Sequence, residues 1–283
     1  MLTKLALLLE NIRFEQSIFT LPFAFLGMVL AARGLPTFHQ FFWITAAMVG
    51  ARSFAMSMNR LQDLDLDARH ARASSRPMPS GRLSIREVLV FSAASVALLL
   101  YAAMQLNPLC VQLAPIALIV FGGYSYVKRV TWLTHAVLGF ALAGSPVGGW
   151  VAVTGTLGWE PILLGLVVWT WATGFDILYA CGDADEDRRL GVRTIPVRFG
   201  IANALRISGV FHIATALLLL AVGETFMLGW PYWIGLSIAI TLLIYQHLIV
   251  TADDLSRLTG AFFTVNGAVS MLIFVSAFAG MSV

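Results

Sequence analysis

The chain has 283 residues, of which 59% are hydrophobic and only 12% are charged. An average soluble domain carries about 25% charged residues, so this composition excludes an ordinary soluble protein and indicates that lipid surrounds most of the chain. The formal net charge of +3 is small, and we expect no nucleic-acid partner; the two cysteines form no CxxC pattern, which argues against a disulfide scaffold.

Nine apolar segments are long enough to cross a membrane, because a spanning helix needs about 20 mainly apolar residues. In chain order they cover residues 15–33, 39–59, 84–106, 109–127, 133–153, 161–181, 203–222, 230–250 and 261–281. Pro108 and Pro115 interrupt the fourth segment, which is therefore the weakest of the nine. We predict an all-α integral membrane protein formed by one domain over residues 1–283.

The charged residues lie almost entirely on one side of these nine segments. With the N-terminus placed in the cytoplasm, only Arg33 of the 18 basic residues falls on the outer side. Of the 15 acidic residues, only Glu160 and Glu224 do so. Cytoplasmic loops are enriched in Lys and Arg, so this partition supports both the number of spans and their direction. We expect the functional site to face the cytoplasm, on the two longest inner loops.

The first acidic cluster follows the second segment. Asn59, Asp63 and Asp67 are spaced i, i+4 and i+8, so a continuing helix would align them along one face. Arg52 lies about two turns deeper on that face, whereas Asp65 points away from it and is expected to be solvated.

The second acidic cluster follows the sixth segment and has the same spacing. Asp183 and Asp187 are i and i+4, and Asp176 lies seven residues earlier on the same face. Asp185 and Glu186 fall off that face and are expected to be solvated. Two clusters of this kind, at corresponding ends of two spans, predict that they face each other.

Stacked carboxylates need a compensating charge. Like charges at i, i+4 destabilise a helix, and ionisable groups at membrane depth are costly and usually functional. A bridging cation removes both problems, and oxygen ligands with room for phosphate and water suit Mg²⁺. Two facing clusters therefore predict two Mg²⁺ ions with a diphosphate between them. The alternative is that the clusters are solvated loop charges.

Basic and aromatic residues accompany the clusters. Tyr124 and Lys128 share a helix face after the fourth segment, either to bind a diphosphate oxygen or as a membrane-surface anchor. Arg193 lies in a segment broken by Gly and Pro and is a candidate diphosphate partner. Arg52 either holds a substrate carboxylate or pairs with Asp176. Residues 76–82 contain two prolines and form either a lid or a basic linker.

The combination resembles the UbiA superfamily of intramembrane aromatic prenyltransferases. The family's NxxxDxxxD, DxxxD, YxxxK and RPxPSG elements all occur here in the family's order. NxxxDxxxD corresponds to Asn59, Asp63 and Asp67, and DxxxD corresponds to Asp183 and Asp187, with Asp176 before them. YxxxK corresponds to Tyr124 and Lys128, and RPxPSG corresponds to residues 76–81. The family's arginine seven residues before the motif Asn is met by Arg52.

The resemblance implies a fold and a set of residue roles. The fold is nine transmembrane helices around a central cavity, with a cytoplasmic cap and a lateral opening for a lipid tail. Arg52 would hold the carboxylate of an aromatic acceptor. Mg²⁺ and the diphosphate would be held by Asn59, Asp63, Asp67, Asp183 and Asp187, with Lys128, Tyr124 and Arg193 binding the diphosphate.

Within the superfamily, the chain is most similar to the 4-hydroxybenzoate polyprenyltransferase-like branch. The resemblance implies Mg²⁺-dependent transfer of a polyprenyl group from polyprenyl diphosphate to 4-hydroxybenzoate, in ubiquinone or menaquinone biosynthesis. The alternative acceptor is 6-hydroxy-1,4-naphthoate, because His135 and Arg193 stand where relatives often have Gln and Lys. A bacterial inner membrane is expected, and no protein partner is inferred. A transporter is disfavoured, because the outer halves of the spans are almost free of ionisable residues.

Overall fold

A computed structural model describes residues 2–14 and 20–282, and in these residues every regular element is a helix. The elements before the fourth predicted span are α1 (Leu2–Asn11), α2 (Leu21–Ala32), α3 (Phe38–Gln62), α4 (Leu64–Arg69) and α5 (Ile85–Leu106). The middle of the chain forms α6 (Pro108–Gly123), η2 (Tyr124–Arg129), α7 (Thr134–Thr154), α8 (Trp159–Ala180), η3 (Cys181–Asp183) and α9 (Ala184–Leu190). The rest forms α10 (Ile195–Phe199), α11 (Ile201–Thr225), α12 (Trp230–Ile249), α13 (Leu258–Gly260), η4 (Ala261–Val265) and α14 (Asn266–Gly280).

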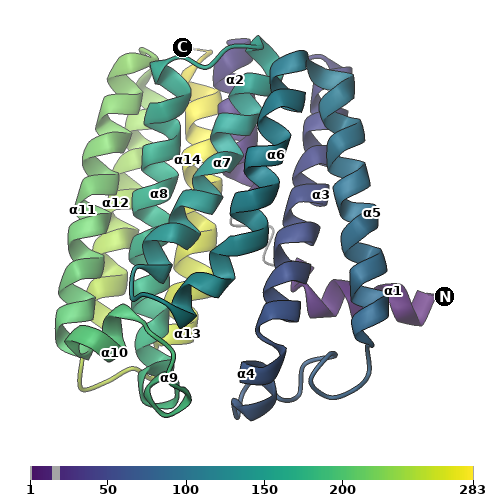
Figure 1. Ribbon diagram of the computed structural model, residues 1–283. Helices are drawn as coiled ribbons and strands as arrows, with labels where there is room; N and C mark the ends of the chain where they lie inside the picture. The colour runs from purple at the N-terminus through teal and green to yellow at the C-terminus, as the bar shows by residue number, and fades with distance from the viewer. Residues whose placement is uncertain (1, 15–19, 283) are drawn as a thin grey trace.

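The all-helical membrane fold is confirmed, with one difference in the number of spans. Within residues 2–14 and 20–282, eight helical segments are long and apolar enough to cross a membrane. The first expected span, residues 15–33, is the one that does not reach spanning length among the described residues. It appears as the 12-residue helix α2, and residues 15–19 of that span lie outside the described residues. Figure 1 shows α2 running alongside the longer helices, so it belongs to the same bundle.

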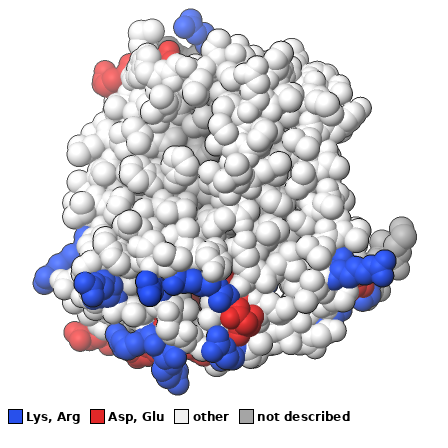
Figure 2. Space-filling model, viewed as in Figure 1, with Lys and Arg blue, Asp and Glu red and all other residues white. Residues whose placement is uncertain are grey.

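The long helices stand side by side, and the short ones gather at one end (Figure 1). Helix α7 packs against α8 and α2, α3 packs against α5, and α11 packs against α8. The short helices α4, α9 and α10 lie at one end of the bundle, and α1 lies across the foot of α3 and α5 (Figure 1). Figure 2 shows that most of the visible Lys, Arg, Asp and Glu side chains lie at this same end, which we call the charged end, and that a few lie at the opposite end.

Glycines let α2 and α7 approach closely, and this contact forms one wall of the bundle. A Cβ atom at Gly27 would lie 2.2 Å from the carbonyl oxygen of Pro146, and a Cβ atom at Gly149 would lie 2.3 Å from that of Ala24. No side chain fits at either position without moving a backbone. Small residues commonly serve this purpose between membrane helices, where close packing replaces the hydrophobic effect.

Polar caps fix where the helices around the site begin. Thr37 and Gln40 form a capping box at the start of α3, and Ser84 and Glu87 form another at the start of α5. Asn107 accepts a hydrogen bond from the Cys110 N–H (3.1 Å) and starts α6. Helix α6 then continues through Pro115, so the interruption expected there does not end the span.

Candidate active site

The first acidic cluster sits where α3 ends at the charged end. The helix stops at Gln62, and α4 begins at Leu64, so the cluster turns at Asp63 instead of continuing along one straight helix. Asn59 Nδ2 nevertheless donates to Asp63 Oδ2 (3.1 Å), and Lys128 Nζ pairs with the same oxygen at 2.6 Å. The contact of Asn59 with Asp63 agrees with their i, i+4 spacing, whereas the pairing of Lys128 with Asp63 was not predicted.

Asp63 is the most deeply buried carboxylate of this cluster, with 2% of its surface exposed. Burial raises the pKa of the Asp63 carboxyl above its usual range, although the ammonium of Lys128 acts in the opposite direction. Its Oδ1 atom is buried and has no hydrogen-bond partner among the described residues. A buried carboxylate oxygen in this state is suited to receive a cation, because an unsatisfied buried acceptor is costly.

Asp67 is held by two arginines. Arg60 Nη1 donates to Asp67 Oδ2 (3.2 Å), and Arg76 Nη1 lies 2.7 Å from both carboxylate oxygens. Arg76 comes from the proline-containing segment 76–82, so this segment does reach the first cluster. Asp65 lies outside the cluster and pairs with Arg129, in agreement with its expected solvated position.

The second acidic cluster follows α8 through η3 into α9. Arg72 Nη2 pairs with Asp183 Oδ2, and the Arg72 guanidinium lies 5.1 Å from the centre of the Tyr179 ring. The Ala71 N–H donates to Glu186 Oε1 (2.7 Å). Glu186 was predicted to be solvated, but it is partly buried and connects the two loops. Segment 70–72 therefore joins the second cluster to the chain that follows the first.

Two cavities meet between these clusters. The larger has a volume of about 700 Å³ and is walled mainly by apolar side chains of α3, α5, α6, α7 and α8. The smaller, of about 200 Å³, is polar and is lined by Asn59 and Lys128 on one side and Asp183 and Asp187 on the other. Residues that line both cavities are Asn59, Tyr124, Leu138, Asp176 and Tyr179. Asn59 of the first cluster therefore faces Asp183 and Asp187 of the second across a small polar cavity that continues into a large apolar one, whereas Asp63 and Asp67 line neither cavity.

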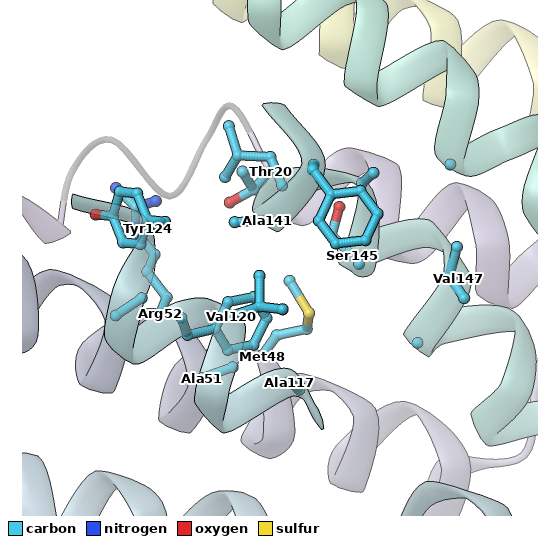
Figure 3. Close-up of a pocket in the computed structure, with 18 of the residues that line it drawn as sticks. Thr20, Met48, Ala51, Arg52, Ala117, Val120, Tyr124, Ala141, Ser145 and Val147 are labelled. Atoms are coloured by element: carbon cyan, nitrogen blue, oxygen red, sulfur yellow. The ribbon is translucent and has the colours of Figure 1, made fainter. Parts of the chain in front are cut away.

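The larger cavity has a few polar groups on its wall (Figure 3). Arg52 reaches it from α3 and donates through Nη2 to the carbonyl oxygen of Arg13 (3.4 Å). Tyr124 is almost fully buried beside it. Across the cavity in this view is Ser145 of α7, whose buried Oγ has no hydrogen-bond partner in the described part of the chain. The mainly apolar wall of the cavity thus includes the Arg52 guanidinium and the unsatisfied hydroxyl of Ser145.

Asp176 lies at the junction of the two cavities and pairs with His135. His135 Nδ1 is 2.7 Å from Asp176 Oδ2, and the Ile195 N–H lies 3.3 Å from His135 Nε2. In the sequence, the position of His135 shortly after Lys128 gave a weak indication that His135 approaches the site.

Arg193 is placed differently from the other predicted residues. Its backbone N–H donates to the Lys128 carbonyl oxygen (2.8 Å), and its guanidinium donates to the carbonyl oxygen of Val130. Its side chain is exposed and lines neither cavity, so in this structure Arg193 supports the η2 segment. Thr194, its neighbour, does line the smaller cavity.

The donor atoms of the two clusters suit a hard divalent cation. Carboxylate and amide oxygens are the ligands that Mg²⁺ prefers, and the unpartnered Oδ1 of Asp63 is one such atom. Over residues 2–14 and 20–282, however, no three His, Cys, Asp or Glu side chains are grouped closely enough to hold a metal ion. Lys128, Arg72 and Arg76 instead contact the carboxylates. The donor chemistry fits, and these basic side chains have to move to complete a site.

Comparison with known proteins places these features in a family. The UbiA prenyltransferase family matches residues 20–275. A 4-hydroxybenzoate octaprenyltransferase of Vibrio cholerae is 33% identical over 224 residues, which cover 79% of this chain and 78% of the relative. The apo structure of a UbiA homolog from Aeropyrum pernix K1 has a TM-score of 0.86 and 31% identity, covering 94% of this chain and 98% of the other.

A more distant solved structure shares the fold. A UbiA homolog from Archaeoglobus fulgidus, bound to GPP and Mg²⁺, has a TM-score of 0.70 and 22% identity, covering 98% of this chain and 100% of the other. At that identity the likeness concerns the arrangement of helices.

Proposed function

Because this chain belongs to the UbiA prenyltransferase family, we propose that it transfers a polyprenyl group from a polyprenyl diphosphate to 4-hydroxybenzoate. The chain is a multi-pass membrane protein and a prenyltransferase by its family and by its relatives at about 30% identity. One observation carries the choice of donor. An apolar cavity of about 700 Å³ continues into a polar cavity of about 200 Å³. The polar cavity is lined by Asn59 and Lys128 on one side and by Asp183 and Asp187 on the other, which matches a molecule with an apolar tail and a diphosphate head.

The head group would be bound in the polar cavity. In the proposed complex, Asn59, Asp63, Asp67, Asp183 and Asp187 supply oxygen ligands to Mg²⁺. Bound Mg²⁺ would neutralise the charge that develops on the diphosphate as the allylic C–O bond breaks.

The basic residues would then change partners. Lys128 Nζ is 2.6 Å from Asp63 Oδ2 in this structure, and Arg72 and Arg76 pair with Asp183 and Asp67. When the carboxylates bind a divalent cation, these ammonium and guanidinium groups are released to donate to diphosphate oxygens. The three basic side chains would therefore stabilise the acidic clusters before the substrate binds and the diphosphate leaving group afterwards.

The acceptor would bind in the larger cavity, near its junction with the polar one. Arg52 offers a bidentate donor for the carboxylate of a small aromatic acid, and Ser145 Oγ offers a hydrogen bond to a polar substituent elsewhere on the acceptor (Figure 3). The surrounding wall is apolar, so it would exclude water from the allylic cation until the ring carbon attacks it.

We further propose that residues 1–283 form a single domain in a bacterial inner membrane, with the charged end facing the cytoplasm. The gathering of basic side chains at that end (Figure 2) supports this orientation.

The test is a membrane assay with a radiolabelled polyprenyl diphosphate. 4-Hydroxybenzoate and 6-hydroxy-1,4-naphthoate are offered separately, with Mg²⁺ or with EDTA. The expected result is Mg²⁺-dependent label in 4-hydroxybenzoate for the wild type and none for Asp63→Ala. Asp65→Ala is the matched control, because the Asp65 side chain is 55% exposed and pairs with Arg129, whereas that of Asp63 is 3% exposed and pairs with Lys128 beside the polar cavity; labelling by Asp65→Ala is expected to stay intact. Label only in the naphthoate would show that 6-hydroxy-1,4-naphthoate, and not 4-hydroxybenzoate, is the acceptor. Label in neither acid would contradict the proposed function.

A further inference from the structure

The pair formed by His135 and Asp176 occupies the point at which the reacting carbon atoms would meet. Asp176 lines both the apolar and the polar cavity, and its side chain is 25% exposed. The His135 side chain behind it is 3% exposed. A carboxylate at this junction lies between the diphosphate site and the acceptor site of the proposed function, on which this inference rests.

The hydrogen bonds of His135 define its protonation. The Ile195 N–H lies 3.3 Å from His135 Nε2 and donates to it, so this nitrogen carries no proton. The proton of the neutral ring is therefore on Nδ1, and Nδ1–H donates to Asp176 Oδ2 at 2.7 Å. A backbone amide thus holds the histidine in the tautomer that presents one N–H to the carboxylate.

Asp176 differs from the other carboxylates near the reaction centre. Among the described residues that line the larger cavity, it is the only Asp or Glu, and no His lines that cavity. Asp63, Asp67 and Asp183 are each paired with Lys or Arg and are the proposed ligands of the cation. Asp176 is not one of these proposed ligands, and it lies at the junction of the two cavities, where it contacts the His135 ring.

We propose that Asp176 removes the ring proton in the last step of prenyl transfer, and that His135 is the positioning residue that orients it. When the allylic cation bonds to the ring carbon ortho to the hydroxyl, π electrons of the ring form the new C–C bond and that carbon still bears its hydrogen. The Asp176 carboxylate accepts this hydrogen as a proton, and the electrons of the C–H bond restore the aromatic ring. The resulting carboxylic acid then returns its proton to water through the polar cavity.

The experiment compares ordinary 4-hydroxybenzoate with the acid deuterated at carbons 3 and 5. In the wild type, breaking of the C–O bond limits the rate, so the isotope effect on turnover is close to unity. Asp176→Asn is expected to lower turnover about 100-fold, within the range of general-base catalysis, and to raise the isotope effect clearly above unity. Diphosphate release then exceeds formation of prenylated acid, because the bond to the ring carbon reverts before the proton leaves and water captures the allylic cation as the prenyl alcohol, releasing a proton.

The variants of His135 separate orientation from simple packing. His135→Leu is expected to show a raised isotope effect with a smaller loss of rate than Asp176→Asn. His135→Gln restores most of that loss, because an amide N–H again donates to Asp176. His212→Leu is the matched control, since His212 is also buried, at 3% exposed, but lines neither cavity; its isotope effect stays at the wild-type value.

Folding of each variant is checked by its stabilisation with geranyl diphosphate and Mg²⁺. An isotope effect near unity in a folded, slow Asp176→Asn enzyme would overturn the proposal and assign proton removal to another group, such as a diphosphate oxygen. Absence of prenylated acid in the wild type would instead refute the proposed function, so the two failures are distinguishable.

Discussion

Removal of the Lys128 ammonium tests whether the buried Asp63 carboxylate depends on a cation. The two groups are 2.6 Å apart, with side-chain exposures of 23% for Lys128 and 3% for Asp63. Breaking a fully buried ion pair by removing one partner costs about 3–5 kcal/mol. Because Lys128 is partly exposed, we expect Lys128→Met to lower the free energy of unfolding by about 2–3 kcal/mol, at the lower end of that range or just below it.

A double variant completes the measurement. The double variant Lys128→Met with Asp63→Asn should recover most of this loss, because no buried charge is left unpaired. The assay is reversible unfolding with SDS in mixed micelles, without Mg²⁺ and then with it. Mg²⁺ should stabilise Lys128→Met more than the wild type, since the ion takes over the role of the ammonium.

The pH dependence of Lys128→Met has a defined sign. The pKa of Asp63 in the folded protein is raised above the ordinary value of 3.8, so the folded state binds more protons than the unfolded state between 3.8 and the raised pKa. Stability from this group therefore falls as pH rises through that window. The loss of the Lys128 cation raises the pKa further, so the deficit of Lys128→Met shrinks in acid. Unchanged stability of Lys128→Met, or a double variant weaker than the single one, would refute the reasoning.

Three other substitutions give separate tests. Arg52→Lys keeps the charge but loses the bidentate fork, so KM for the aromatic acid should rise about 10- to 100-fold, the loss of one charge-assisted hydrogen bond; in steady-state kinetics, an equal rise in KM for the prenyl diphosphate would contradict the assigned role. Ser145→Ala should raise KM for the acid by about 2- to 10-fold. The ligand-free variant should be at least as stable as the wild type in the SDS assay, because the substitution removes a buried hydroxyl that has no partner among the described residues. A less stable variant would contradict this. Gly149→Ala should destabilise the bundle by about 1–3 kcal/mol, because its Cβ atom would lie 2.3 Å from the backbone oxygen of Ala24. Gly148→Ala is the control, since a Cβ atom there meets nothing within 4 Å. Equal stability of the two variants would exclude the close contact of α2 and α7.

The membrane fold was predictable because the bilayer sets the length of a spanning helix. Eight of the nine apolar segments have helices of spanning length in the described part of the chain. Part of the two acidic clusters was predictable from their i, i+4 spacing: Asn59 contacts Asp63, and Asp183 and Asp187 line the same small cavity. Asp67 instead follows the turn at Asp63 and is held by Arg60 and Arg76. Local periodicity of this kind depends on near neighbours in the sequence and needs no knowledge of the fold.

The contacts between distant segments were not predictable from spacing. Arg72 and Asp183 are 111 residues apart, and His135 and Asp176 are 41 apart, so only the packing of α7 on α8 and the course of the loop after α4 bring them together. Arg193 shows the opposite case. Its residue type and its position in the sequence suggested a contact with the diphosphate. In the structure its guanidinium instead donates a hydrogen bond to the backbone carbonyl oxygen of Val130.

The most direct test of the central claim is a structure with an unreactive thio analogue of geranyl diphosphate and Mn²⁺. We predict anomalous peaks for Mn²⁺ at the carboxylates of Asp63 and Asp183, with the diphosphate in the small polar cavity, Lys128 turned from Asp63 toward it, and the tail in the large cavity. A diphosphate bound elsewhere, or Mn²⁺ at neither cluster while Lys128 remains on Asp63, would contradict the account.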